Sequence, residues 1–228
     1  MQLRLWGWRP ALAQTIGLVL MFSPVAALAV ASGTTPQGPT GQSPVARLIK
    51  AVNARTRLPA PMVSKTVWNG LDVDGDGASD FVNPTGQAPR LLDAFGYGEF
   101  GASRDGGSRQ HEGVDYTADA DQAVAAPISG FVTKIGYAYG GDDSLRFVEI
   151  TNPALGYVAR AFYVDPDVLV GQAVRLGETI GTVASLQSHY PGITDHVHLE
   201  VMKSGERLNA ETLIVARTIK VKARTANG

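Results

Sequence analysis

The stretch Asp195-His196-Val197-His198-Leu199-Glu200-Val201 decides both the fold of this chain and its chemistry. Its polar and apolar residues alternate, which is the pattern of a β-strand with one buried face. Both histidines and Glu200 then share one face, while Val197, Leu199 and Val201 share the other. The sequence therefore predicts a half-buried strand that presents two imidazoles, about 6–7 Å apart along the strand, to a common site.

A second segment with compatible spacing is His111-Glu112-Gly113-Val114-Asp115. In an extended chain His111 and Asp115 are four residues apart and lie on the same face. A lone histidine in a strand is usually structural, but three of the four histidines here lie in two short clusters. Histidine and carboxylate suit zinc, and catalytic zinc sites use three protein ligands and leave a fourth position open. The two segments together predict a zinc site.

The composition is that of a globular protein with many turns. Of the 228 residues, 44% are hydrophobic and 18% are charged, and the formal net charge is −1. The total shows no basic excess, so nucleic acid is not expected as a partner. The 26 glycines and 13 prolines favour short strands and turns over long helices. The chain has no cysteine, which excludes disulfides and a lipidated cysteine.

The N-terminal residues have the pattern of a secretory signal peptide. Arg4 and Arg9 precede an apolar run at residues 16–22, and small residues follow it. The alternative is an uncleaved membrane anchor, but the run ends at Ser23 and is short for a membrane span. We therefore expect residues 1–29 to be cleaved. The mature protein is then expected in the periplasm or outside the cell, without a stable membrane span.

Two further segments precede the expected main domain. Residues 30–43 are rich in Gly, Pro, Ser and Thr and predict a flexible linker. Residues 44–88 open with a short amphipathic helix, for which Ser43 is a suitable cap and Pro44 a suitable first residue. The apolar stripe of this helix comprises Val45, Leu48, Ile49 and Val52.

An Asp-rich loop follows the helix within residues 44–88. Its carboxylates occupy positions 1, 3, 5 and 9 of a calcium-type loop, and a glycine occupies position 6. Position 12 is Asn83, where strong calcium loops have a bidentate glutamate. Two alternatives stay open, because clustered carboxylates repel one another unless a cation is present: a Ca²⁺ site, or an acidic, solvated turn. The four carboxylates are Asp72, Asp74, Asp76 and Asp80.

Residues 89–216 predict a compact, mostly antiparallel β-domain. Short β-runs at 126–135, 145–151 and 157–164 are separated by turn residues, and no long helical periodicity interrupts them. The last residues, 217–228, are expected to form a frayed tail. The fold class is thus mostly β with a short N-terminal helix.

The two histidine motifs resemble those of a known family. A His-x-x-x-Asp motif that begins at His111, followed by a His-x-His motif that begins at His196, is similar to the lysostaphin-type (LytM-like) zinc metallopeptidases. The similarity covers residues 95–215, and it includes the stretches Ala-Pro-Ile-Ser-Gly-Phe-Val at 126–132 and Val-Gly-Gln-Ala-Val-Arg-Leu-Gly-Glu-Thr-Ile-Gly at 170–181. Its implied fold is the compact β-domain expected above.

The resemblance also implies roles for individual residues. By analogy with the family, His111, Asp115 and His198 would bind Zn²⁺, and His196 would be a catalytic histidine beside the metal. The family implies action on the peptide cross-links of peptidoglycan, so a cell-wall peptide is the expected partner.

The chain departs from the family at one catalytic position. Family enzymes carry another histidine on the strand that here reads Arg160-Ala161-Phe162-Tyr163-Val164, and Tyr163 takes its place. This substitution resembles the leukocyte cell-derived chemotaxin-like branch more than the classical endopeptidases. A tyrosine donates a hydrogen bond at neutral pH but does not readily shuttle protons. Two functions stay open: a zinc peptidase with weak activity, and a non-catalytic zinc-binding relative that binds cell-wall peptide or a protein partner.

The surroundings of Tyr163 are also predicted from alternation. In a regular strand Tyr163 shares a face with Ala159 and Ala161, which would suit a groove for an extended peptide, or it belongs to an ordinary half-exposed strand. His189 lies in a loop near the His-x-His strand and is expected at the surface; the alternative is that it replaces the missing strand histidine.

Overall fold

The computed structural model describes residues 43–55 and 61–223. The chain divides into two units, residues 1–58 and 59–228. In the first unit the predicted helix is confirmed as α1, Pro44–Arg55, and the Ser43 hydroxyl accepts a hydrogen bond from the Val45 N–H. The expected signal peptide and nearly all of the expected linker lie outside the described residues.

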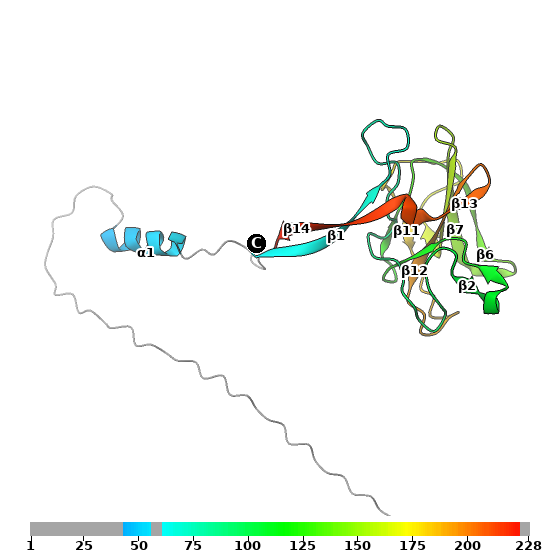
Figure 1. Cartoon of the computed structure of the whole chain (residues 1–228), viewed down its shortest axis with the longest axis horizontal. Helices are drawn as coiled ribbons and strands as arrows, with labels where there is room; N and C mark the ends of the chain where they lie inside the picture. The colour runs from blue at the N-terminus through cyan, green and yellow to red at the C-terminus, as the bar shows by residue number, and fades with distance from the viewer. Residues whose placement is uncertain (1–42, 56–60, 224–228) are drawn as a thin grey trace, which may run out of the picture. The chain divides into compact units, whose positions relative to one another are not determined.

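The second unit is built from antiparallel strands, as predicted (Figure 1). Seven strands form the larger sheet and three form a smaller one. In order across the larger sheet they are β10 (Ala173–Val174), β6 (Gly130–Tyr139), β7 (Asp142–Asn152), β8 (Tyr157–Phe162), β12 (His196–Lys203) and β13 (Glu206–Leu208), and β4 (Val114–Thr117) also pairs with β12. The smaller sheet comprises β5 (Ala123–Ala125), β11 (Thr179–Val183) and β9 (Val164–Pro166).

Two strand pairs stand outside these sheets. Strands β2 (Ser103–Arg104) and β3 (Arg109–Gln110) form a short hairpin, and β1 (Met62–Gly70) pairs with β14 (Ile214–Lys222). Two 3-10 turns complete the described elements, at Asp105–Gly107 and Ala210–Thr212. Among the described residues no helix has the length and hydrophobicity needed to cross a membrane.

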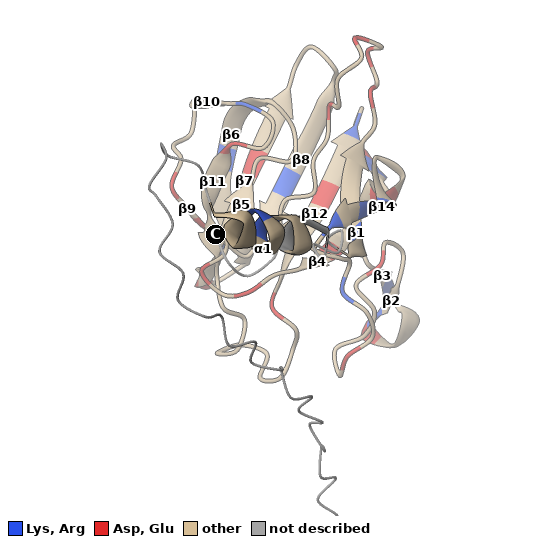
Figure 2. Ribbon diagram, turned by 90° about the vertical axis from the view of Figure 1, so that its left-hand side faces the viewer, with Lys and Arg blue, Asp and Glu red and all other residues tan. Residues whose placement is uncertain are grey.

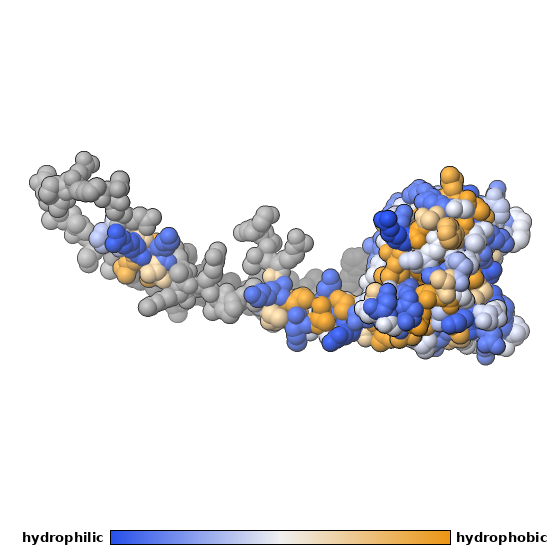
Figure 3. Space-filling view, turned by 90° about the horizontal axis from the view of Figure 1, so that it is seen from above, coloured by the Kyte–Doolittle hydropathy of each residue, from blue (hydrophilic) through white to orange (hydrophobic). Residues whose placement is uncertain are grey.

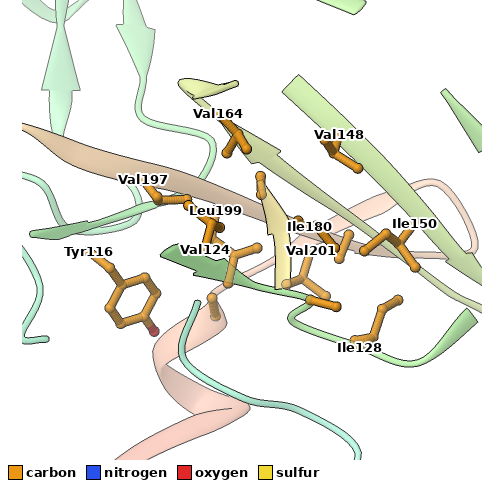
Figure 4. Close-up of a cluster of buried hydrophobic side chains, with 14 of the residues drawn as sticks. Tyr116, Val124, Ile128, Val148, Ile150, Val164, Ile180, Val197, Leu199 and Val201 are labelled. Carbon is orange, nitrogen blue, oxygen red and sulfur yellow. The ribbon is translucent and has the colours of Figure 1, made fainter. Parts of the chain in front are cut away.

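The core lies between the larger and smaller sheets (Figure 4). From β12 it receives Val197, Leu199 and Val201, all fully buried, and from the smaller sheet Val124 and Ile180 point toward them. The predicted alternation is the reason, because every second side chain of β12 faces this layer. Burying each such side chain stabilises the fold by about 1.5–3 kcal/mol. The opposite face of β12 is thereby fixed toward the histidine site.

The C-terminal part differs from the expected tail at 217–228. Residues up to Lys222 belong to β14, which pairs with β1 in unbroken register from Met62 opposite Lys222 to Gly70 opposite Ile214. The alternating aliphatic residues near the C-terminus are a strand pattern whose partner is far away in sequence, so local reasoning did not find it. The folded unit also begins before residue 89, because Phe81 is buried in the core.

Candidate metal centre

The register of β12 against β4 brings the two histidine motifs together. His198 of β12 lies directly opposite Asp115 of β4, and His111 precedes β4 in the same chain segment. Gly113 permits this close approach, since a Cβ there would lie 2.5 Å from the Leu199 carbonyl oxygen and 2.8 Å from the His198 ring. A glycine between His111 and Asp115 is therefore part of the site.

Three donor atoms converge on one point. His198 Nδ1 lies 2.8 Å from Asp115 Oδ1 and 2.8 Å from His111 Nε2. His111 Nε2 lies 3.1 Å from Asp115 Oδ1. Ligand atoms held about 2.0 Å from a tetrahedral zinc ion are about 3.3 Å apart, so an outward shift of a few tenths of an ångström fits the ion. This cluster of His111, Asp115 and His198 could hold a metal ion.

Neighbouring groups orient two of these candidate ligands. The Nδ1–H of His111 donates to the Glu99 carbonyl oxygen at 2.8 Å, which leaves the lone pair of Nε2 toward the cluster. The Arg90 guanidinium lies 2.8 Å from Asp115 Oδ2, and Arg90 itself is 4% exposed. Because Arg90 holds Oδ2, the other oxygen of Asp115 stays free to face the histidines.

Glu200 supports the third candidate ligand from the same face of β12. Its Oε1 lies 3.7 Å from His198 Nε2 and 3.5 Å from the Arg207 guanidinium. Its Oε2 lies 3.6 Å from the Arg160 guanidinium. Burial alone would lower the pKa of His198, but its hydrogen bond to Asp115 and the nearby Glu200 carboxylate outweigh burial and raise that pKa to about 9. Without a metal the imidazole therefore holds a proton that an ion must displace.

His196 lies beside the cluster but outside it. The Nδ1–H of His196 donates to the Thr194 carbonyl oxygen at 2.6 Å, so Nε2 carries the lone pair and lies 3.6 Å from Asp115 Oδ1. Burial lowers the pKa of His196, which is 3% exposed. A neutral imidazole with its lone pair toward the site is suited to accept a proton.

Tyr163 reaches the site in a way that the predicted alternation missed. It has a left-handed backbone conformation, with φ of +65°, at the corner where the chain leaves β8 for β9. This corner interrupts the strand, so Ala159 and Ala161 are buried in the core while Tyr163 lines the histidine cleft. The predicted groove of alanines is therefore wrong.

The phenol of Tyr163 is held by a second tyrosine. Its Oη lies 2.8 Å from the Oη of Tyr139 on β6, and its ring stands perpendicular to His196 with centroids 5.3 Å apart. Burial raises the pKa of Tyr163 to about 12. The residue is thus a neutral donor beside the candidate base.

The cluster lies in a cleft of about 400 Å³ with two kinds of wall. One wall is aromatic and apolar, with Phe95 and Tyr190 in edge contact at 5.7 Å between centroids. The other is charged, and Figure 2 shows acidic, basic and acidic residues side by side on β7, β8 and β12. They are Glu149, Arg160 and Glu200, which are direct cross-strand neighbours, and of the three Arg160 and Glu200 line the cleft.

The Asp-rich loop forms a separate cluster. Asp72, Asp74 and Asp80 approach one another closely enough to hold a metal ion, whereas Asp76 is outside this group. The carboxylates accept backbone N–H groups of the loop, as in the 2.6 Å contact from the Gly75 N–H to Asp72. Asn83 is buried and its amide binds the following turn, so it does not reach the loop. Calcium binding stays a prediction.

Several residues of the site were not singled out from sequence. Arg90, Tyr139 and the Glu99 carbonyl are brought to the cleft by long-range contacts, and no local signal marks them. Glu200 did have a signal, because it shares the histidine face of its strand. His189 lies at the surface, where it contacts Asp142 at 3.0 Å.

Known proteins with similar sequences define the family. The model of Peptidase family M23 matches residues 109–210. Leukocyte cell-derived chemotaxin-2 of Mus musculus is 32% identical over 117 residues, which cover 51% of this chain and 75% of that protein. The Bos taurus protein of the same name is 31% identical over 112 residues, 49% of this chain and 71% of that protein. The chain belongs to peptidase family M23.

Solved structures of similar fold include lysostaphin. The catalytic domain of lysostaphin from Staphylococcus simulans has 21% sequence identity and a TM-score of 0.41, and the likeness covers 50% of this chain and 86% of that domain. The solution structure of lysostaphin has 24% identity and a TM-score of 0.39. There the likeness covers 49% of this chain but only 44% of the other, so the chain spans less than half of that lysostaphin structure.

Proposed function

We propose that this chain is an exported zinc metallopeptidase that hydrolyses the cross-link peptides of peptidoglycan. The observation that carries the proposal is the convergence of three ligand-type atoms, from His111, Asp115 and His198, beside a histidine whose lone pair faces them. Membership of family M23 supports the reaction class. These residues lie in a cleft of about 400 Å³, which also has aromatic side chains in its lining.

The residues divide the work of hydrolysis between them. His111, Asp115 and His198 would hold a zinc ion, which would supply a Lewis acid for the peptide carbonyl and lower the pKa of water. His196 Nε2 accepts the proton of the attacking water and returns it to the leaving amine. The hydroxyl groups of Tyr139 and Tyr163 lie 2.8 Å apart, and when Tyr139 is the donor the Tyr163 proton is left for the developing oxyanion.

A second candidate function is zinc-dependent binding without cleavage. Its support is the Tyr163 phenol, which replaces an imidazole and has a pKa raised to about 12. A phenol of this kind donates one hydrogen bond but does not exchange protons at neutral pH. The ligand would then be a cell-wall peptide or a protein partner that occupies the same cleft.

Digestion of purified peptidoglycan separates the two functions. We expect the zinc-loaded protein to release peptides slowly, His196→Ala to keep its zinc and release none, and Tyr163→Phe to be slower by about 10²–10³. Tyr163→His should be faster than the wild type. One bound zinc per chain with no digestion by the wild type would contradict the peptidase and favour the binding function.

Export is the remaining part of the proposal. Its support is the basic and apolar pattern of residues 1–29, which lie outside the described residues. N-terminal sequencing of protein recovered from outside the cytoplasm should find a new terminus near residue 30. An intact Met1 in that fraction would contradict cleavage.

A further inference from the structure

The pair β1–β14 is a ribbon that the two main sheets do not cover. Its two strands pair only with each other among the described elements, and Figure 1 shows the ribbon extending away from the other strands. A two-stranded sheet is at best marginally stable in water unless its faces pack against something. Core contacts at Trp68 and Ile214 secure only one end of the ribbon.

One face of this ribbon is aliphatic. The register places the side chains at 63, 65, 67 and 69 on the same face as those at 221, 219, 217 and 215. Val63 is 44% exposed and Val215 is 53% exposed, and Figure 3 shows hydrophobic residues gathered along the ribbon beside strongly hydrophilic ones. The aliphatic members of this face are Val63, Val67, Val215, Ile219 and Val221.

The same ribbon is exclusively basic. It contains Lys65, Arg217, Lys220 and Lys222 and no acidic residue, and none of the four forms an ion pair with any residue that the structure describes. Lys65 and Arg217 project from the aliphatic face itself, opposite Ile219 and Val67. Lys65 and Arg217 thus lie among the aliphatic side chains on one face of the ribbon, and Lys220 and Lys222 lie on the opposite face.

Charge is segregated along the whole chain. All 21 Asp and Glu residues lie between Asp72 and Glu211, and that segment contains only nine Lys and Arg. The other 11 Lys and Arg lie outside the segment, where no acidic residue occurs. The net charge of −1 therefore conceals an acidic domain and basic flanks. Helix α1 repeats the chemistry of the ribbon, with Arg47 and Lys50 beside exposed Leu48 and Ile49.

We propose that the β1–β14 ribbon docks on an anionic phospholipid surface. Its cations attract the anionic lipid headgroups, and each cation raises the affinity for the membrane about fivefold. Its aliphatic face enters the boundary between the headgroups and the acyl chains. The acidic domain between the flanks is repelled by the same surface. The ribbon therefore holds the domain near a membrane while the domain itself stays in water.

Two other occupants fit this face less well. A soluble anionic polymer would satisfy the cations but would leave the aliphatic side chains in water, with no gain from their burial. A second copy of the ribbon would cover the aliphatic side chains but would bring Lys65 and Arg217 against the same cations of its partner, and like charges at an interface are costly. Only an anionic bilayer satisfies both features.

Vesicle sedimentation tests the proposal with the chain that begins at residue 30. All core residues lie at or after Trp68, so this chain keeps the complete core. We expect binding to phosphatidylcholine vesicles that contain phosphatidylglycerol and little binding to phosphatidylcholine alone. Lys65→Thr with Arg217→Thr should weaken binding about 25-fold, from about fivefold for each charge. The matched control, Lys134→Thr with Arg175→Thr, removes two exposed charges elsewhere and should change it little.

A second variant tests the aliphatic part. Val63→Thr, Val215→Thr and Ile219→Thr together keep strand-favouring residues and should also weaken vesicle binding. Unchanged zinc content shows that each variant is folded. The proposal is overturned by equal binding to both kinds of vesicle or by unchanged binding of the ribbon variants. The proposal is also overturned if the wild type forms a dimer that the triple variant of Val63, Val215 and Ile219 does not form. It is likewise overturned if the wild type binds soluble polyphosphate as tightly as vesicles and the triple variant binds polyphosphate equally well.

Discussion

Charged side chains are arranged in opposite ways in the histidine cleft and on the β1–β14 ribbon. Around the three candidate ligands the charged groups are buried and paired, and Asp115 has Arg90 on one oxygen and histidines on the other. On the ribbon the cations are exposed and have no acidic partner among the described residues. Buried pairs fix the geometry around one ion, because each misplaced group is costly in a medium of low dielectric. Exposed cations act additively and at a distance, and salt screens them.

The largest expected effect separates the two regions completely. His198→Ala should abolish stoichiometric zinc binding, because only two of the three candidate ligands remain. Lys65→Thr with Arg217→Thr should leave zinc binding unchanged. Zinc per chain measured by atomic emission after dialysis checks both variants. Equal zinc in His198→Ala and the wild type would contradict the ligand assignment.

The next effect concerns the free energy of unfolding without metal. The pKa of His198 is raised above 6.5 to about 9, so its contribution to stability is complete below pH 6.5 and is lost as the pH rises through about 9. We expect the metal-free protein to lose up to about 3 kcal/mol across this window. Urea unfolding at several pH values measures it. The double variant of Lys65 and Arg217 should follow the wild type, and a stability that is flat with pH would contradict the paired state of His198.

A smaller effect is expected from the support of a ligand. Glu200→Leu removes the carboxylate 3.7 Å from His198 Nε2, and the loss of such a partner typically weakens metal affinity by about 10–100-fold. Glu200→Gln keeps an acceptor and should restore much of the affinity. Competition with a zinc chelator measures both variants. Equal zinc affinities in the leucine variant and the wild type would mean that Glu200 only neutralises the charges of Arg160 and Arg207 and does not support His198.

The smallest expected effect is at the Asp-rich loop. If Asp72, Asp74 and Asp80 bind Ca²⁺, calorimetry should detect weak binding that Asp72→Asn removes, because a cation relieves the repulsion of the carboxylates. Asp76→Asn is a matched control, since Asp76 is outside the cluster. No heat on calcium addition to the wild type would favour the solvated turn.

Some parts of the site could be predicted from the sequence and others could not. Alternation in residues 195–201 was sufficient to predict a half-buried strand with both histidines on one face, because this property is local. The separate roles of His196 and His198 came from resemblance, since spacing alone does not say which ring nitrogen faces the ion. The contact from Arg90 to Asp115 joins distant parts of the chain, and no pattern near Arg90 reveals it.

Two sequence-based predictions failed for different reasons. The side of the strand on which Tyr163 lies was wrong because a positive φ, rare for tyrosine, breaks the alternation at that residue. The strand at 217–222 went unnoticed because its partner is β1, near the other end of the folded unit. The basic flanks were also missed, because the net charge of the whole chain does not show where the charged residues lie.

The corner at Tyr163 has a consequence for how this lineage can change. The Tyr163 N–H and carbonyl are both held, by the Arg146 carbonyl and the Ala184 N–H, so the backbone there does not depend on the side chain. Histidine tolerates this left-handed conformation at least as well as tyrosine. Tyrosine and histidine codons differ by a single base. One point mutation can therefore replace the phenol at this corner with an imidazole without rebuilding the fold.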